Sequence, residues 1–320
     1  MPYLVRRVLY SLFLLAGVSL LTFVLVDLAP GEFFDEMRLN PRVSAATIAG
    51  LRSQYGIDRP LPLKYLRWLR SVARGEGGFS FAYNSPAAPI VWHRAENTLL
   101  LTGAATLFAW LIALPFGIWS AAKPGSVMDL LAAGTISTLL AIPDVILALL
   151  VLLAAVRSGY FPLGGVVSPD FLQLGFWSQC KDLARHFFLP TLCLTAGFLP
   201  LLLLHVRASM IEVLESPFIA AARAHGIPFR RLLLRHALPA AANPLVSLFG
   251  FSLGILLSSS VVIEGIFGWP GLGRLLIEAI LERDFYLVVD AAVLATIFLI
   301  FGNLLADALL YALDPRIRTQ

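Results

Sequence analysis

Two glycine-containing motifs in this chain have the residue types of hydrolase or nucleotide-binding sites. The run Gly250-Phe251-Ser252-Leu253-Gly254 matches the Gly-x-Ser-x-Gly pattern, whose chemistry needs a strand-turn-helix context with a histidine and an acid nearby. This copy lies inside an apolar run, so helix packing through small residues is the favoured interpretation. The run from Gly268 to Gly273 is glycine-rich, but no Gly-Lys dipeptide occurs in the chain, which excludes a P-loop. We therefore predict that the chain is not an enzyme and binds no cofactor, so that any ATP and Mg²⁺ that drive it are used by another subunit.

The remaining titratable residues show no spacing typical of a metal site or an acid–base pair. The five histidines are scattered, and the two cysteines, Cys180 and Cys193, form neither a disulfide framework nor a metal motif. Asp144 follows Pro143 within an apolar run, where a carboxylate is costly and suggests a function. Two interpretations stay open: Asp144 lines a path across the membrane and binds a cationic group of a substrate, or it is a satisfied residue at a helix kink. The other carboxylates in or near apolar runs are Asp27, Asp290 and Asp307.

The composition indicates that these residues belong to a membrane protein. Of the 320 residues, 58% are hydrophobic and 14% are charged, and the mean hydropathy is +0.82. A soluble domain of this length cannot bury so much apolar surface, whereas a bilayer can, so we predict an all-helical polytopic membrane protein. The net charge of +4 comes mainly from arginines and includes no extended basic tract, which favours contact with membrane lipid and argues against nucleic acid.

Six apolar segments are long enough to cross a bilayer of roughly 30 Å. The first follows Arg6 and Arg7, as in a signal peptide, but its length and its lack of a small-x-small cleavage site predict an uncleaved span. Prolines within several segments indicate a packed bundle, because neighbouring helices must satisfy the carbonyl groups that proline frees. The predicted spans are 8–28, 99–121, 130–156, 187–206, 245–263 and 287–310, and the prolines are Pro115, Pro143, Pro190 and Pro200.

The distribution of basic residues predicts the orientation. With the N-terminus inside, ten Lys and Arg residues fall on the cytoplasmic side and five in the two short outer loops, while a long segment crosses regardless of its charge. Both termini are then cytoplasmic in a multi-pass protein of the cell inner membrane. The long outer segment 30–95 forms a small subdomain that either meets an external partner or only caps the bundle. Its part 61–75 is expected to be an amphipathic helix whose apolar face carries Leu63, Leu66, Trp68, Leu69 and Val72.

The cytoplasmic loop 207–244 carries the most specific pattern in the chain. Ser216 is a candidate helix N-cap, Pro217 suits a first turn and Gly226 is a natural stop, which predicts a short helix over 217–225. Its alanines let it lie in a groove on a partner, and the arginines beside it can pair with carboxylates or with anionic lipid. Docking to a protein and lying on the lipid surface therefore both stay open. A second helix is expected from Ile227-Pro228 to Pro239, carrying Arg230, Arg231 and Arg235.

This loop resembles the coupling loop of ABC importer permeases. The family pattern is Glu-Ala-Ala-x-x-x-Gly and, further on, Ile-x-Leu-Pro; here Ala220-Ala221-Ala222, Gly226 and His236-Ala237-Leu238-Pro239 occupy these positions. Ala220 replaces the glutamate and His236 the isoleucine, and both departures agree with the branch that serves dipeptides, oligopeptides and nickel. That branch reads Ala-Arg-Ala-Lys-Gly, and here Ala222-Arg223-Ala224-His225-Gly226 has a histidine in place of the lysine.

Further stretches resemble the same family, in order, along nearly the whole chain. Residues 4–32, with Ala29-Pro30-Gly31, are similar to its N-terminus, and Gly56 to Pro60 is similar to its Gly-x-Asp-x-Pro segment. The subtype is similar to the dipeptide "B" permease. The other matching stretches are the turn from Gly75 to Ser80, the block from Glu264 to Arg274, Arg283-Asp284-Phe285, and Leu313-Asp314-Pro315-Arg316.

The resemblance implies an ABC transmembrane type-1 fold and a role as permease subunit of an ATP-driven, binding-protein-dependent importer, with di- or oligopeptides as expected substrates. It implies three kinds of partner: a homologous second permease, two ABC ATPase subunits and an extracytoplasmic substrate-binding protein. The alternative, an ion- or proton-coupled secondary transporter, predicts paired intramembrane acids and an internal repeat, and the sequence shows neither.

The same resemblance implies a layout and a set of site residues. The layout is a transmembrane helix at 1–29, an extracytoplasmic segment at 30–95, a core of five spans at 96–311 that includes the coupling loop, and a cytoplasmic tail at 312–320. The residues expected to couple to the ATPase are Glu215, Ala221, Ala222, Arg223, Ala224 and Gly226, and those of the extracytoplasmic family block are Glu264, Trp269, Pro270 and Gly271.

Overall fold

The computed structural model describes residues 2–30, 33–34, 44–55 and 59–313. The family features expected at Gly31, within 56–58 and within 314–320, including most of the cytoplasmic tail, lie outside these residues. Regular structure in the described part is almost entirely α-helix, and its strands form one short antiparallel hairpin of β1 (Phe79–Ser80) and β2 (Ser85–Pro86). The predicted all-helical class is confirmed.

Five helices in the described ranges are long and apolar enough to span a membrane. Each contains one of the predicted spans, but α5 starts at Ala87 instead of residue 99 and α8 starts at Phe176 instead of residue 187. The added turns of α5 are amphipathic, with Val91 and Ala95 buried at helical spacing, so they do not stand out as a continuous apolar run. The five helices are α1 (Pro2–Leu28), α5 (Ala87–Ala122), α8 (Phe176–Leu214), α12 (Ala242–Ile266) and α14 (Phe285–Leu313).

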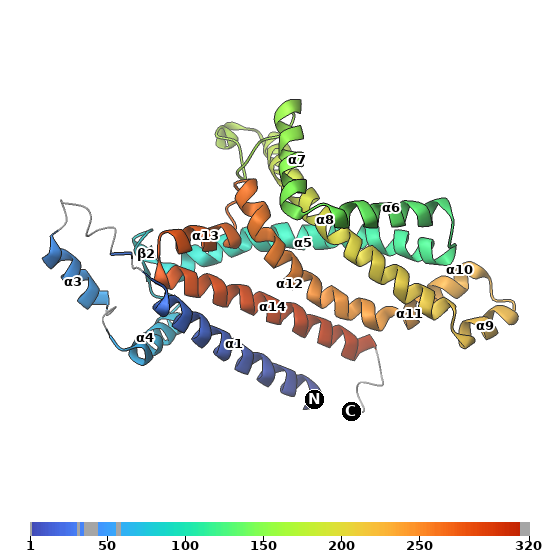
Figure 1. Ribbon diagram of the computed structural model, residues 1–320, viewed down its shortest axis with the longest axis horizontal. Helices are drawn as coiled ribbons and strands as arrows, with labels where there is room; N and C mark the ends of the chain where they lie inside the picture. Colours follow the sequence, from blue (N-terminus) through green and yellow to red (C-terminus); the bar gives the residue numbers. More distant parts are fainter. Residues whose placement is uncertain (1, 31–32, 35–43, 56–58, 314–320) are drawn as a thin grey trace. The chain divides into compact units, whose positions relative to one another are not determined.

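The third predicted span, 130–156, is not one straight helix. It is divided into α6 (Val127–Ala141) and α7 (Asp144–Ser158), which are bent by 98° across Ile142 and Pro143 (Figure 1). Ile142 is extended, at φ −101° and ψ 116°, because the ring of a following proline disfavours the helical conformation. The described residues therefore provide five spans, or six if the bent pair forms one.

The chain divides into two compact units, and α8 is the central helix of the larger one, which includes residues 100–269 and the described part of 301–320. Helix α8 packs against α6, α7 and α12, and its Leu202 and Met210 are fully buried in the core. Short elements surround α8 in the chain: a 3-10 turn (Phe171–Gln173) before it, and α9 (Pro217–Ala224), α10 (Phe229–Leu232), a π-helical turn (Leu233–Ala237) and α11 (Leu238–Ala240) after it.

Helices α12 and α14 of this larger unit approach each other closely at Gly250. A Cβ atom there would lie 2.2 Å from the Cβ of Ala306 and 3.0 Å from the carbonyl oxygen of Gly302. In the same motif, the Ser252 hydroxyl donates to the Leu248 carbonyl of its own helix and accepts a hydrogen bond from the indole of Trp110. The Gly-x-Ser-x-Gly motif is thus a helix-packing site, as its apolar surroundings predicted.

The smaller unit comprises the described residues of 5–99 together with 270–300. A buried aromatic cluster joins α1 to α4, with Phe23 edge-on against both Tyr65 and Phe285. The Trp68 indole donates a 2.7 Å hydrogen bond to the Asp290 carboxylate. The helices complete within this unit are α3 (Ala45–Tyr55), α4 (Leu61–Ala73) and α13 (Leu272–Leu281).

The hairpin of the smaller unit begins at the predicted glycine-rich turn. The Asp284 carboxylate accepts hydrogen bonds from the Ser80 hydroxyl at 2.7 Å and from the Ala82 amide at 3.1 Å. Asp284 and Ser80 are both fully buried, so these bonds fix the hairpin against the start of α14. Asp284 belongs to one of the stretches that resemble the permease family, and its contacts give that stretch a structural role.

The amphipathic helix predicted at 61–75 is present as α4, and of the five residues assigned to its apolar face only Trp68 is buried. Trp68 is 2% exposed, and Leu61 and Tyr65 share its side of the helix at spacings of seven and three residues. Aromatic rings fill the contact with α1, so the leucines are left on the other side. The other residues of the predicted apolar face, Leu63, Leu66, Leu69 and Val72, are between 40% and 60% exposed.

Replacing Gly250 by alanine should push α12 away from α14 and destabilise the larger unit. We expect the free energy of unfolding to fall by about 1–3 kcal/mol, the usual cost of overpacking a tight contact. The measurement is thermal unfolding of the purified protein in detergent. The control is Gly103→Ala on α5, where an added Cβ meets nothing within 4 Å and should cost nothing. Equal melting temperatures for the two variants would contradict the close approach.

Candidate coupling and pathway sites

The short helix predicted in the loop 207–244 is present as α9, and its C-terminal end has a defined cap. Gly226 adopts the left-handed conformation, at φ +76°, directly after the last residues of the helix. The Gly226 amide donates to the Arg223 carbonyl at 3.0 Å, and the Ile227 amide donates to the Ala222 carbonyl at 3.4 Å. These two bonds form a Schellman motif, so glycine stops the helix here as predicted.

The other end of α9 differs from the prediction. Ser216 occupies the N-cap position, but its side chain accepts no capping hydrogen bond. The Ser216 hydroxyl instead donates to the carbonyl of Val213 at 2.5 Å, in the last turn of α8. The Ser216 amide also donates to Val213, and the Glu215 amide donates to Ile211. The two residues between α8 and α9 are therefore hydrogen-bonded back to α8.

Helix α9 is anchored on one side and open on the other. Ile219 is completely buried, and Ala222, one turn later, packs against the same core. The remaining expected coupling residues lie on the surface: Glu215, Ala221, Arg223, Ala224 and Gly226 are all exposed. Phe218 is 50% exposed and was not predicted as part of the site. An exposed aromatic ring beside alanines and an arginine is suited to a protein contact.

The second helix expected in this loop is present but contains a π-helical turn. Helix α10 continues through the π turn into α11, which ends at Ala240, one residue after the predicted end. The π turn lies just before Pro239, which has no amide hydrogen to donate to the helix. Leu232 and Ala237 are fully buried, whereas Arg230, Arg231 and Arg235 are exposed. This segment therefore presents its basic residues outward.

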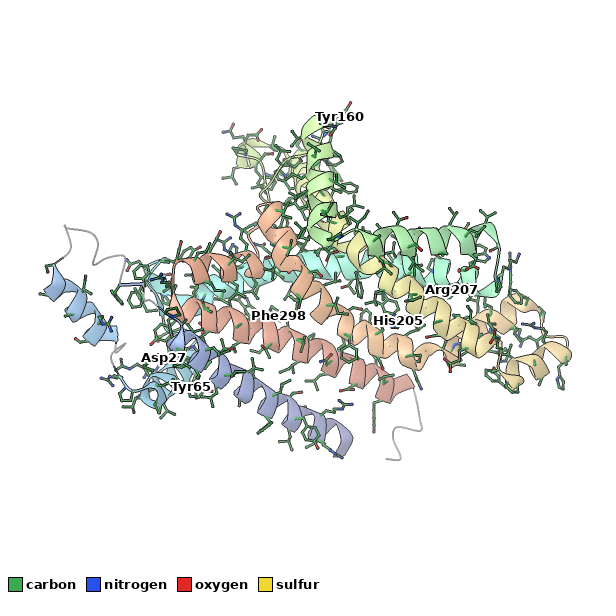
Figure 2. The ribbon with its side chains drawn as sticks, in the orientation of Figure 1. Asp27, Tyr65, Tyr160, His205, Arg207 and Phe298 are labelled. Atoms are coloured by element: carbon green, nitrogen blue, oxygen red, sulfur yellow. The ribbon has the colours of Figure 1, made fainter. Side chains whose placement is uncertain are left out.

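A partly buried ion pair, not anticipated from the sequence, joins α6 to α8. The Arg207 guanidinium donates to both carboxylate oxygens of Asp129, from Nε at 2.8 Å and from Nη2 at 3.3 Å (Figure 2 labels Arg207). Asp129 also accepts hydrogen bonds from the Ser120 hydroxyl at 2.5 Å and from the Gly125 amide at 2.9 Å. A carboxylate with four donors from three chain segments fixes α5, α6 and α8 relative to one another at this point.

One local sequence signal could have identified Asp129. The Asp129 amide donates to the Ser126 hydroxyl at 3.3 Å, so Ser126 caps α6. Ser-x-x-Asp before an apolar run is a helix N-terminus pattern. Its pairing with Arg207, 78 residues later, carries no local signal because it depends on how α6 packs against α8.

Asp144 lies at the bend between α6 and α7 and faces α8. A Cβ atom on Gly197 would lie 2.7 Å from the Asp144 carboxylate, so only glycine leaves space there. Asp144 lines a small cavity of about 70 Å³ together with Cys193, Gly197 and Ser259. Within the described part of the chain, its carboxylate makes no hydrogen bond or ion pair, and it lies in the first turn of α7.

The residues of the family block expected on the extracytoplasmic side mostly make contacts within the protein. In the larger unit, Glu264 and Trp269 are buried, and the Trp269 amide donates to the Glu264 carbonyl at 2.9 Å. In the smaller unit, the Pro270 carbonyl accepts a hydrogen bond from the Asn97 side chain at 2.9 Å. Gly271 directly precedes α13 as its N-cap residue. Burial of both Glu264 and Trp269 keeps these two side chains from forming an exposed docking surface.

Comparison with known proteins gives consistent matches over the whole chain. Residues 113–319 match the family model described as binding-protein-dependent transport system inner membrane component, and residues 1–101 match the model of the N-terminal part of such components. The chain is 34% identical over 317 residues to the oligopeptide transport system permease protein AppB of Bacillus subtilis, covering 98% of each chain. It is 31% identical over 335 residues to the dipeptide transport system permease protein DppB of Escherichia coli, covering 99% of each.

A similar fold occurs in a solved structure, that of the MetNI methionine ABC transporter in inward-facing conformations. The TM-score is 0.53 with 19% sequence identity, and the match covers 70% of this chain and 96% of the other. At this identity the likeness concerns the fold alone. It agrees with the type-1 transmembrane architecture expected from the sequence.

Substituting Asp129 by asparagine should weaken the junction of α5, α6 and α8. We expect the free energy of unfolding to fall by about 1–3 kcal/mol, since the Arg207 guanidinium loses its charged acceptor. Thermal unfolding in detergent of Asp129→Asn, Arg207→Gln and the double variant forms a double-mutant cycle. The double variant should lose less stability than the sum of the two single variants. Asp170→Asn, at an exposed position, is the control, and additive effects would rule out a coupled pair.

Proposed function

Because this chain belongs to the family of binding-protein-dependent transport system inner membrane components, we propose that it forms part of the substrate path of an ATP-driven peptide importer. Family membership confirms the resemblance found in the sequence and the prediction of a transport subunit that is not an enzyme. The relatives named above are peptide permeases, which supports a peptide substrate. They give no support to the alternative of an ion- or proton-coupled secondary transporter.

We propose a homologous second permease, two ATPase subunits and an external substrate-binding protein as the partners. The family description itself requires a binding protein, and a chain without a Gly-Lys dipeptide needs a separate ATPase. We propose that the protein is located in the inner membrane, with both termini in the cytoplasm. The larger number of basic residues on the side of the termini and of the loop 207–244 supports this orientation.

The single observation that carries the coupling proposal is the anchored, outward-facing helix α9. Its open face offers Ala221, Arg223 and Ala224 to a partner, while Ile219 holds the helix to the core. Small side chains allow close approach of a partner surface, and the arginine can pair with a carboxylate in it. The exposed alanines and arginine of a helix that joins a long span favour a protein as the partner of α9. A lipid surface is the competing interpretation, and the Arg223 variant below distinguishes the two.

Motion of α9 would reach the spans through α8. Only Glu215 and Ser216 separate the two helices, and both are hydrogen-bonded to the end of α8. Helix α8 in turn packs against α6, α7 and α12, and Arg207 ties it to Asp129. We propose that closure of the ATPases displaces α9 and α8 as one body. That displacement would switch the path between outward and inward access.

We propose that Asp144 faces this path and contacts a cationic group of some substrates. Its carboxylate lies at a helix bend, borders a cavity and has no hydrogen-bonding partner in the described residues. An unpaired carboxylate within the apolar layer is costly, which favours a functional reason for it. The cavity of about 70 Å³ is too small for a dipeptide, so a wider path would need the outward- or inward-open arrangement.

Replacing Arg223 by glutamate should separate the chain from its ATPase. We expect ATPase co-purification and peptide uptake to fall by at least roughly tenfold, because a like-charge contact at an interface costs several kcal/mol. Arg157→Glu, at an exposed position near the end of α7, is the matched charge reversal and should leave both unchanged. Retained ATPase and full uptake in Arg223→Glu would favour a lipid-facing role for α9 and reject the coupling proposal.

Replacing Asp144 by asparagine should change substrate preference while leaving assembly intact. Uptake of cationic peptides should fall by about tenfold relative to neutral ones, equivalent to about 1.4 kcal/mol of lost interaction. The assay compares uptake of peptides that differ only in charge, with the same binding protein present. Ser259→Ala, which changes another residue of the same cavity, is the control. Unchanged relative uptake would remove Asp144 from the path.

A further inference from the structure

A row of arginines lines a cavity in the smaller unit that the proposed function does not use. Arg67, Arg70 and Arg74 follow one another along one side of α4. They border a cavity of about 560 Å³, whose wall also includes Tyr286 of α14. Glu76 is the carboxylate among the lining residues, and it accepts a hydrogen bond from the Ser71 hydroxyl at 3.3 Å. Three guanidinium groups and one carboxylate leave the lining cationic, which suits an anionic ligand.

The contacts of α4 place this cavity beside a membrane span. The Tyr65 hydroxyl is 2.8 Å from the Ser19 hydroxyl of α1, and Lys64 forms an ion pair with Asp27 at the end of α1 (Figure 2 labels Tyr65 and Asp27). Ser19 lies well inside the apolar helix, at about 13 Å from Leu28 by helical rise. Helix α4 therefore lies along the final turns of a span, at the level where headgroups meet acyl chains.

The exposure of the leucines of α4 is consistent with a position at the boundary between headgroups and acyl chains. Leu63, Leu66 and Leu69 are exposed on the side of α4 opposite to the aromatic contact with α1. In water this surface would be unfavourable, whereas at the bilayer boundary it enters the apolar layer. The arginines flank the leucines on the same helix, so one element offers an apolar surface and a cationic cavity side by side.

We propose that this cavity binds the phosphate headgroup of an anionic phospholipid, whose acyl chains lie against the leucines of α4. Guanidinium groups bind phosphate oxygens in pairs, which makes an arginine row a suitable receptor. The site rests on the position of α4 beside α1 and is independent of whether α9 docks an ATPase. An acidic segment of a protein would match the charge, but it would not account for the leucines beside a span.

Native mass spectrometry of the full chain in neutral detergent tests the proposal. The probes are phosphatidylglycerol and phosphatidylcholine with identical acyl chains, and glycerol phosphate as the soluble anion. The variant is Arg70→Gln with Arg74→Gln, which removes both charges and keeps a polar side chain at each position. We expect phosphatidylglycerol binding to weaken by at least roughly tenfold, and the weaker binding of phosphatidylcholine, whose choline cation offsets its phosphate, to fall by a smaller factor.

Two further variants separate the parts of the site. Arg157→Gln, an exposed arginine of the other unit, should leave the binding of both lipids unchanged. Leu63→Ser with Leu66→Ser should weaken both lipids alike, since it removes the apolar contact. The proposal is overturned if the double arginine variant binds phosphatidylglycerol as tightly as the unmodified chain. It is also overturned if glycerol phosphate binds as tightly as phosphatidylglycerol. A third contrary outcome is that a purified acidic binding protein displaces the lipid and that the binding of this protein depends on Arg70 and Arg74.

Discussion

A chain inside a bilayer has to satisfy its backbone N–H and C=O groups internally, and this constraint applies most strongly at the bend between α6 and α7. At the bend after α6, the Ile142 amide bonds to Leu139 and the Leu147 amide bonds to the carbonyl of Pro143, so both sides of the break remain hydrogen-bonded. The Schellman motif closes α9 in the same manner at the loop 207–244. Irregular backbone therefore occurs where capping bonds replace the helical ones.

Helix α8 brings the candidate sites of the larger unit onto one rigid element. Gly197 makes room for the Asp144 carboxylate, Arg207 holds Asp129, and the end of the helix leads into α9. Pro190 and Pro200 lie within α8 without interrupting it. A displacement of this helix would change the surroundings of Asp144 and the junction at Asp129 together. A movement of α8 therefore affects both the proposed coupling site at α9 and the proposed substrate path at Asp144.

Apolar runs were enough to predict the class and the spans, because a bilayer imposes length and hydrophobicity directly. The short helix at 217–225 was predicted from its flanking residues, Ser216, Pro217 and Gly226. The bend at Pro143, the buried side of α4 and the pair of Asp129 and Arg207 depend on tertiary packing. Four prolines lie within apolar runs of the sequence, yet of these only Pro143 separates two helices. Helix α5 continues past Pro115 and α8 continues past Pro190 and Pro200, because a packed bundle tolerates proline within a helix. The pattern of α4 predicted an apolar face, but which of its residues are buried depends on the aromatic contact with α1. The pair of Asp129 and Arg207 depends on contacts between distant segments and could not be read locally.

The hydrogen bonds at the junction of α8 and α9 use backbone groups and the Ser216 hydroxyl, and none of them involves the exposed face of α9. Two of the positions at which this chain departs from the family patterns, Ala220 and His225, are exposed, and the His225 ring bonds to the carbonyl of Ala221 in its own helix. In the proposed coupling, the exposed side chains of α9 recognise the ATPase, and the hydrogen bonds at its junction with α8 transmit the displacement. Substitutions on that exposed surface therefore change the fit to an ATPase without altering the junction.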